Sequence, residues 1–257
     1  MQHNLKLPPL AGLLVAGTII LVWIGSLGFC SAIDISRISP VWIVPAILGR
    51  TFIQTGLFIV GHDAIHGVVM PSDRRLNQAI GRLVVTLYAF LSYQKLAQNH
   101  ALHHQHPGQS QDPDFHNGTN DQIWSWYLSF MTGYLELRQF LIQLLGMGSI
   151  FAILYFGLNT PLINLFFFFF LPIFLSTMQL FIFGTYLPHR STNFANSHHA
   201  TSSNFPFLLS FLTCYHFGYH WEHHEYPFLP WYHLPSARKN LAQNPSLKPN
   251  IELFSSN

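Results

Sequence analysis

Four long apolar stretches stand out in the pattern of hydrophobic and polar positions. They cover approximately residues 10–30, 41–61, 140–158 and 162–185. A hydrocarbon core about 30 Å thick is crossed by roughly 20 helical residues, so each stretch is long enough to span a bilayer. The sequence therefore predicts an all-α integral membrane protein with four transmembrane helices.

The breaks between these stretches predict two hairpins. Asn, Thr and Pro at residues 159–161 interrupt the third and fourth stretches with a very short turn, which favours an antiparallel helical hairpin. Two shorter apolar stretches, 79–93 and 205–219, are below spanning length and are expected at the membrane interface. We expect residues 1–257 to form a single membrane-embedded domain.

Composition agrees with a membrane location. Only 9% of the residues are charged, whereas an ordinary soluble domain is about 25% charged, and 24 residues are phenylalanine. The formal net charge of +2 is too small to indicate nucleic-acid binding, and the basic residues do not form runs. Nucleic acid is therefore not an expected partner.

Histidines provide the strongest chemical signal. Two near-copies of H-x-x-H-H occur in NHALHHQHPG and GYHWEHHEYP, and an H-x-x-x-H pair occurs in GHDAIHGVV. In a helix, positions i, i+3 and i+4 share one face with Cβ atoms roughly 5–6 Å apart, so each triplet can direct several imidazoles to one point. One zinc ion takes about four ligands, so eight or nine histidines indicate two metal ions. The predicted ligands are His62, His66, His100, His103, His104, His189, His220, His223 and His224.

The remaining histidines are expected to have other roles. His216 lies four residues before His220, and we expect it to support the site or to pack rather than to bind metal. The other predicted non-ligands are His3, His106, His116, His198, His199 and His233.

Acidic residues lie beside the histidines in the sequence. A ligating imidazole usually donates its second N–H to a carboxylate or carbonyl. The residues expected to accept such hydrogen bonds are Asp63, Asp112, Asp114, Glu222 and Glu225. Asp112 and Asp114, in DPDFHNG, are also the candidates for a catalytic role.

Several residues in or near the apolar stretches carry their own expectations. Arg50 lies inside the predicted second helix, where a charge is costly, but the sequence does not name its partner. The run Phe166 to Phe170 is expected to face lipid. The predicted interfacial anchors are Trp124, Trp126, Tyr127, Trp231 and Tyr232.

The basic residues predict the orientation. With four crossings, the N-terminus, the segment 62–138 and the tail from about residue 186 share one side. Of the 12 lysines and arginines, Arg37 lies on the opposite side and Arg50 lies inside a span, which leaves ten on the shared side. Cytoplasmic loops carry an excess of Lys and Arg. Both termini and all histidine clusters are therefore expected on the cytoplasmic side.

The order H-x-x-x-H, H-x-x-H-H, H-x-x-H-H around paired membrane hairpins resembles the membrane fatty-acid desaturase and hydroxylase superfamily, and more narrowly its β-carotene ketolases. The resemblance rests on residues 55–69, 100–118, 183–189 and 214–235. It implies a non-haem di-iron centre held by the predicted histidines, O2 as co-substrate, a carotenoid substrate and a ferredoxin-type electron donor.

The activity implied by this resemblance is that of a carotenoid 4-ketolase. Ring carbon 4 of a β-ionone ring would be hydroxylated twice, and the geminal diol would lose water to give a ketone. A carotenoid ring hydroxylase or an acyl-lipid desaturase is an alternative, because the same histidines serve all three reactions. A histidine-rich metal transporter is a more distant alternative, since the apolar helices lack the carboxylates or histidines expected along an ion path.

Overall fold

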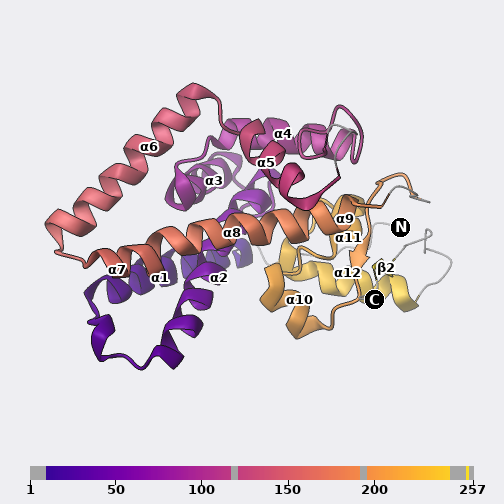
Figure 1. The fold of residues 1–257 in the computed structure, drawn as a ribbon. Helices are drawn as coiled ribbons and strands as arrows, with labels where there is room; N and C mark the ends of the chain where they lie inside the picture. Colours follow the sequence, from indigo (N-terminus) through magenta and orange to yellow (C-terminus); the bar gives the residue numbers. More distant parts are fainter. Residues whose placement is uncertain (1–9, 117–120, 192–195, 244–252, 255–257) are drawn as a thin grey trace.

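Four helices are long and apolar enough to cross a membrane, which confirms the predicted number of spans. The computed structural model describes residues 10–116, 121–191, 196–243 and 253–254 (Figure 1). The spans are α1 (Ala11–Ala32), α2 (Pro40–Ile65), residues Leu137–Gly157 and residues Leu162–His189. The second and fourth spans continue past their apolar stretches to residues 65 and 189, close to the predicted ligands.

The third and fourth spans each contain π-helical segments. The third consists of α6 (Leu137–Ala152) and the π-helical η2 (Ile153–Gly157). The fourth consists of α7 (Leu162–Leu165), η3 (Phe166–Phe170), α8 (Leu171–Phe181), η4 (Ile182–Tyr186) and α9 (Leu187–His189), of which η3 and η4 are π-helical. Segments of this type often lie at functional sites. Here η4 directly precedes α9, which ends at His189.

Shorter helices complete the fold. They are α3 (Arg74–Ala89), α4 (Tyr93–Gln105), α5 (Ile123–Gly133), α10 (Phe207–Cys214), α11 (His220–Glu225) and α12 (Leu234–Gln243), with the 3₁₀ turns η1 (Ile35–Arg37) and η5 (Trp231–His233). Two short strands, β1 (Ser202–Ser203) and β2 (Leu253–Phe254), pair in parallel. In Figure 1, α4, α9, α11 and α12 gather at one end of the spans.

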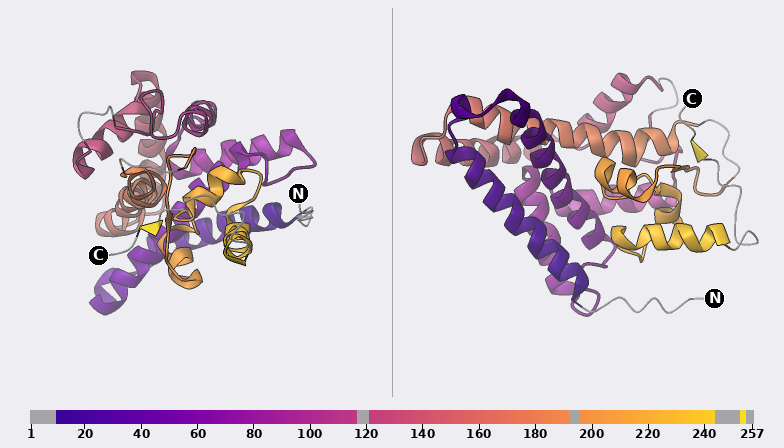
Figure 2. Two further views of the ribbon diagram at one scale, coloured as in Figure 1. Left: turned by 90° about the vertical axis from the view of Figure 1, so that its right-hand side faces the viewer. Right: turned by 90° about the horizontal axis from the view of Figure 1, so that it is seen from below.

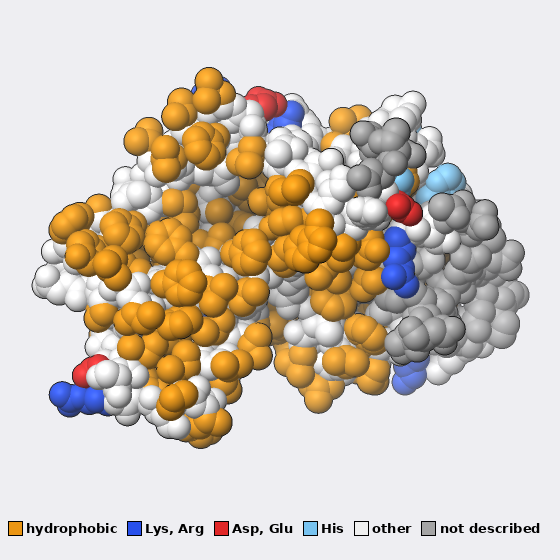
Figure 3. Space-filling model, viewed as in Figure 1, with side chains coloured by type: hydrophobic (Ala, Val, Ile, Leu, Met, Phe, Trp, Pro, Cys, Tyr) orange, Lys and Arg blue, Asp and Glu red, His pale blue; other side chains and the backbone are white. Residues whose placement is uncertain are grey.

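Helix α2 is the centre of the packing. It contacts α1, α3 and α8, and the right-hand view of Figure 2 shows α1 and α2 crossing as a hairpin. The buried face of α3, which includes Ile80, Val84 and Tyr88, packs on α2. By contrast, only 6% of the third span is buried, and Figure 3 shows hydrophobic side chains concentrated over the part of the molecule that contains the spans. That exposure fits a helix whose surroundings are lipid.

Arg50 binds backbone and hydroxyl oxygens of the neighbouring spans. It is 2% exposed, its Nε donates to the Phe168 carbonyl at 3.1 Å, and its Nη1 donates to the Trp23 carbonyl at 3.2 Å and to Ser26 Oγ at 2.8 Å. The buried charge therefore joins α1, α2 and η3. It gives the intramembrane arginine the partners that the sequence alone does not identify.

Two expectations about aromatic residues are wrong in part. In the phenylalanine run, Phe168 and Phe169 are buried, whereas Phe166 and Phe170 are exposed and can face lipid. Of the predicted interfacial anchors, Trp126 is fully buried, because its indole N–H donates to the Asp114 carbonyl and its ring packs against Phe181. Tyr127, another predicted anchor, is also buried, whereas Trp124 is exposed and Trp231 and Tyr232 are half-buried.

Candidate metal centre

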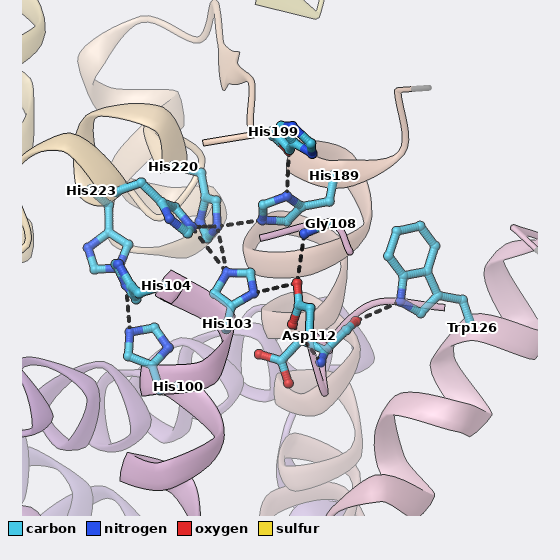
Figure 4. Close-up of polar contacts among 12 residues, drawn as sticks. His100, His103, His104, Gly108, Asp112, Trp126, His189, His199, His220 and His223 are labelled. Carbon is cyan, nitrogen blue, oxygen red and sulfur yellow. Dashed lines mark hydrogen bonds and ion pairs between the residues drawn. The ribbon is translucent and has the colours of Figure 1, made fainter. Parts of the chain in front are cut away.

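Four separate segments bring all nine predicted ligands to one place. The last turn of α2 and the residue after it supply His62 and His66, α4 supplies one triplet, α9 supplies His189, and α11 supplies the second triplet. Figure 4 shows imidazoles from α4, α9 and α11 pointing toward one another. The spacing inside each triplet has the effect expected from helix geometry, because each set of side chains lies on one helix face.

The first group consists of His62, His66, His100 and His223. One ring nitrogen from each of these side chains lies within 4.8 Å of those of the others. His104 adjoins this group, because its Nε2 lies 3.0 Å from Nε2 of His100 and 2.9 Å from Nε2 of His223. A fifth imidazole therefore adjoins this group of four.

The second group consists of His103, His189, His220 and His224, all buried, with ring nitrogens again within 4.8 Å of one another. Nε2 of His220 lies 2.9 Å from Nε2 of His189 and 3.0 Å from Nε2 of His224. Four ring nitrogens converge on this second point.

Hydrogen bonds fix the tautomers of two of these rings. Nδ1 of His189 lies 2.8 Å from the His199 carbonyl, and Nδ1 of His103 lies 2.9 Å from Asp112 Oδ2. A carbonyl or carboxylate oxygen accepts, so each Nδ1 must donate. In a neutral ring Nε2 then carries a lone pair, and in both residues that lone pair is on the side of the converging nitrogens. This is the arrangement of a metal ligand and its outer hydrogen-bond partner.

Four of the histidines outside the spans are held in the neutral form that binds a metal, whereas Asp112 raises the pKa of His103 against the effect of burial. Burial lowers the pKa of His66 to about 4, and burial followed by the charges of neighbouring histidines lowers the pKa of His100, His220 and His223 well below its usual value. At neutral pH these rings are therefore uncharged. Within the described residues, both ring nitrogens of His62 also lack a hydrogen-bond partner.

A metal pair fits this donor set. Buried nitrogens that face one another with lone pairs are costly without a cation between them. Imidazole suits iron, copper and zinc, and each of the two groups supplies at least four donors. The residues present can therefore hold two metal ions with the nine histidines as ligands.

Asp112 hydrogen-bonds a member of the second group and is not itself one of its predicted metal ligands. Its carboxylate is 5% exposed and accepts hydrogen bonds from His103, from the Gly108 N–H at 2.9 Å and from the Asp114 N–H at 2.9 Å. Three donors hold this carboxylate in place. It can in turn hold the imidazole of His103 at a fixed angle.

Asp114 has a different environment. Its Oδ1 accepts a hydrogen bond from the Tyr134 hydroxyl at 2.5 Å. Burial raises the pKa of Asp114 to about 6. The neighbouring His103 acts in the opposite direction and lowers this pKa, because a carboxylate oxygen of Asp114 lies within 4.8 Å of a ring nitrogen of His103.

The other predicted acidic partners are placed elsewhere. Glu222 accepts from the Ser202 hydroxyl and, at 2.8 Å, from Arg238, and Glu225 pairs with His198 at 2.8 Å. The prediction that these two glutamates accept from ligating imidazoles is therefore wrong. Asp63 Oδ1 lies 3.5 Å from His62 Nδ1, while its Oδ2 accepts the Trp231 backbone N–H at 3.2 Å.

The histidines expected not to bind metal lie outside both groups wherever they are described. His216 is buried, packs against Tyr219 and bonds Ser210 through Nδ1, so it faces away from the ligands although it lies four residues before His220. His199 contributes its backbone carbonyl to the site as the acceptor for His189 Nδ1. His3 lies outside the described residues.

A cavity of about 190 Å³ adjoins the histidines. Its walls reach from His62, His100, His103 and His220 to side chains of the spans, and they are mostly apolar. Sequence reasoning did not find this cavity. The sequence signal for the cavity is a polar residue inside an apolar stretch, such as Thr177, which lines the cavity.

Comparisons with known proteins agree with this geometry. The fatty acid desaturase family matches residues 36–150 and 134–249. A zeaxanthin 4-ketolase from Chlamydomonas reinhardtii is 36% identical over 96% of this chain and 58% of its own length. A β-carotene 4-ketolase 3 from Haematococcus lacustris is 40% identical over 73% of this chain and 59% of its own length.

A bacterial relative is covered more completely. A β-carotene ketolase from a Paracoccus species (strain N81106 / MBIC 01143) is 39% identical over 88% of this chain and 91% of its own length. The chain thus spans less than three fifths of the length of the two algal relatives but nearly all of the bacterial one. With four membrane-spanning helices and the converging histidines, this chain belongs to the fatty acid desaturase family, among the relatives of the carotenoid ketolases.

Proposed function

We propose that this protein is a carotenoid 4-ketolase that uses two non-haem iron ions and O2. The observation that supports it best is the position of the cavity, which joins mostly apolar walls to four of the predicted ligands. A carotenoid ring is apolar and enters such a cavity from lipid without losing hydrogen bonds. The names of the relatives supply the substrate class and the reaction.

The nine histidines would hold the iron ions in two groups. His62, His66, His100, His104 and His223 would hold one ion, and His103, His189, His220 and His224 the other. When bound, the iron pair supplies the O2 activation needed to oxidise an unactivated C–H bond.

The protein side chains position the substrate and the ligands. Phe58, Ile173 and Leu180 line the cavity and would hold the ring by apolar contact while excluding water. Asp112 would keep His103 in the tautomer that presents Nε2. We therefore assign Asp112 a positioning role and Asp114, which lines the cavity, a role beside the substrate.

The reaction balances as two oxidations and a dehydration. In each oxidation one O2, two electrons and two protons place one oxygen atom on carbon 4 and release one water. The resulting geminal diol loses one hydroxyl group together with the proton of the other hydroxyl. These leave as water, and a ketone remains. A soluble donor of the ferredoxin type is proposed to supply the electrons.

The proposed orientation places both termini and the metal centre in the cytoplasm. Four spans are an even number, and the excess of basic residues lies on the side that carries the histidines. We also propose one domain for residues 1–257, because the two family matches overlap and together cover residues 36–249.

The test is expression of the chain in cells that accumulate β-carotene, with pigment analysis by chromatography and mass spectrometry. Ketones carrying oxygen at carbon 4 are expected from the wild type, and purified protein should contain about two iron ions per chain. His103→Ala should abolish both ketone formation and binding of the second iron. His106→Ala is the matched control directly after the same helix, because His106 lies outside both histidine groups.

Other products would identify the alternatives. Ring alcohols without ketones would indicate a hydroxylase, and new double bonds in acyl chains a desaturase. Ketone formation by a folded His103→Ala protein would contradict the ligand assignment of His103.

A further inference from the structure

A polar pair lies in the mostly apolar cavity. Asp114 and Tyr134 both line it, and the Tyr134 hydroxyl donates to Asp114 Oδ1 at 2.5 Å. The side chain of Asn99 also hydrogen-bonds this hydroxyl. The hydroxyl proton of Tyr134 is therefore already used in a hydrogen bond. The oxygen atoms of the pair can only accept a hydrogen bond from a molecule in the cavity.

Asp114 has acceptor capacity beyond its bond with Tyr134, because a carboxylate offers about four lone-pair sites. Asp114 is also the one acidic residue among the described side chains that line the cavity. A carboxylate is an acceptor only, so this corner of the cavity selects for a group that donates.

This corner lies beside the histidines. A carboxylate oxygen of Asp114 lies within 4.8 Å of a ring nitrogen of His103, and His103 lines the same cavity. A hydroxyl on the carbon that faces the metal centre would therefore be close to the carboxylate. A group at the far end of the substrate would not.

The three forms of carbon 4 differ in what they can donate. A methylene has no hydrogen-bond donor, an alcohol has one, and a ketone has only acceptors. An acceptor-only corner thus binds the alcohol more tightly than either the substrate or the final product. Binding of this kind keeps an intermediate in place and lets the ketone leave.

We propose that Asp114, oriented by Tyr134, retains the 4-hydroxy intermediate so that the second oxidation occurs before release. This inference rests on the proposed ketolase function and concerns the property that separates a ketolase from a hydroxylase. The retained alcohol undergoes the second oxidation, which takes one O2, two electrons from the external donor and two protons, and yields the geminal diol and one water. Loss of water from the diol then removes the retained hydroxyl donor.

The test measures the ratio of 4-hydroxy to 4-keto product in cells that accumulate β-carotene. Tyr134→Phe preserves the ring but frees Asp114 from its partner, and Asp114→Asn replaces one acceptor with a donor. Each variant should raise the alcohol-to-ketone ratio about tenfold, the size expected for loss of a hydrogen bond to a charged group. Tyr155→Phe is the matched control, because Tyr155 lies on the third span and is absent from the described cavity lining.

A second measurement separates retention of the alcohol from a general structural effect. With purified, iron-loaded protein, the KM for the 4-hydroxy carotenoid should rise about tenfold more than the KM for β-carotene in the Tyr134→Phe variant. Equal changes in both KM values would overturn the inference, as would an unchanged product ratio in both variants. If the wild type forms no oxidised carotenoid at all, the proposed function fails, and the inference fails with it.

Discussion

A single carboxylate, Asp112, sets the geometry of one predicted ligand. It is fixed by the backbone N–H groups of Gly108 and Asp114, so the hydrogen bond that it accepts from His103 has a defined direction. Residues in this position contribute to metal affinity although they do not touch the metal. The effect of Asp112 should therefore be measurable as iron retention.

Asp112→Asn should lower iron affinity about ten- to a hundredfold, because the amide can present a donor to Nδ1 of His103 and disturb its tautomer. Iron retained during dialysis against a graded series of chelator concentrations measures the change. Asp121→Asn, an exposed substitution in the same loop, is the control. Equal retention in the two variants would contradict the positioning role of Asp112.

At the residue scale, the sequence predicts ligands better than their partners. The histidines are visible because helical spacing places each triplet on one face. The partners of Glu222 cannot be predicted from the sequence, because Ser202 and Arg238 come from separate segments of the chain. They, and not the adjacent histidines, donate hydrogen bonds to Glu222. Tyr134 has no sequence signal at all, since a tyrosine near a helix end is ordinary.

At the element scale, the close packing of α2 and α3 positions the first histidines. A Cβ at Gly61 would lie 2.5 Å from Val85 Cγ1, and one at Gly81 would lie 2.8 Å from Ala64 Cβ. The glycines therefore permit an approach that larger residues prevent. His62 follows Gly61 directly, so its position depends on this contact.

Gly61→Ala should force α2 and α3 apart and lower the thermal unfolding temperature by on the order of 5 °C, as expected for an overpacked core. Iron content should fall with it. Gly49→Ala, on the same helix but with open space around its Cβ, should change neither quantity. Thermal unfolding in detergent and metal analysis test the pair, and equal unfolding temperatures would argue against tight α2–α3 packing.

Hydropathy predicts where the spans lie but not where they end. The apolar stretch 41–61 stops at His62, yet α2 continues to Ile65, and the stretch 162–185 continues as helix to His189. A helix can leave the hydrocarbon and remain a helix, whereas hydropathy reports only the part in contact with lipid. His62 and His189 lie in these polar extensions, and His66 follows the first of them directly.

At the scale of the whole molecule, the histidine groups connect segments that have few other reasons to stay together. The groups join α2, α4, α9 and α11, which approach from both hairpins and from the segment after the last span. A metal that binds only the folded arrangement stabilises it by mass action. The end of the molecule that carries α4 and α11 should therefore depend on metal more than the spans do.

Removal of iron with a chelator should lower the unfolding temperature by on the order of 10 °C. Amide hydrogen exchange should accelerate in α4 and α11 and change little in α1 and α8. Restoring iron should reverse both effects in the wild type but not in His103→Ala. Unchanged exchange in α4 and α11 would show that packing alone holds these helices.

The order of the ligands along the chain has a consequence for biosynthesis. The last span ends at His189, and the second triplet follows only at residues 220–224. During translation all four spans are complete before the final ligands leave the ribosome, so membrane insertion precedes assembly of the centre. A chain that stops before His220 would retain every span yet lack three of the nine histidines. Cellular quality control that recognises only failed membrane insertion would not degrade such a chain.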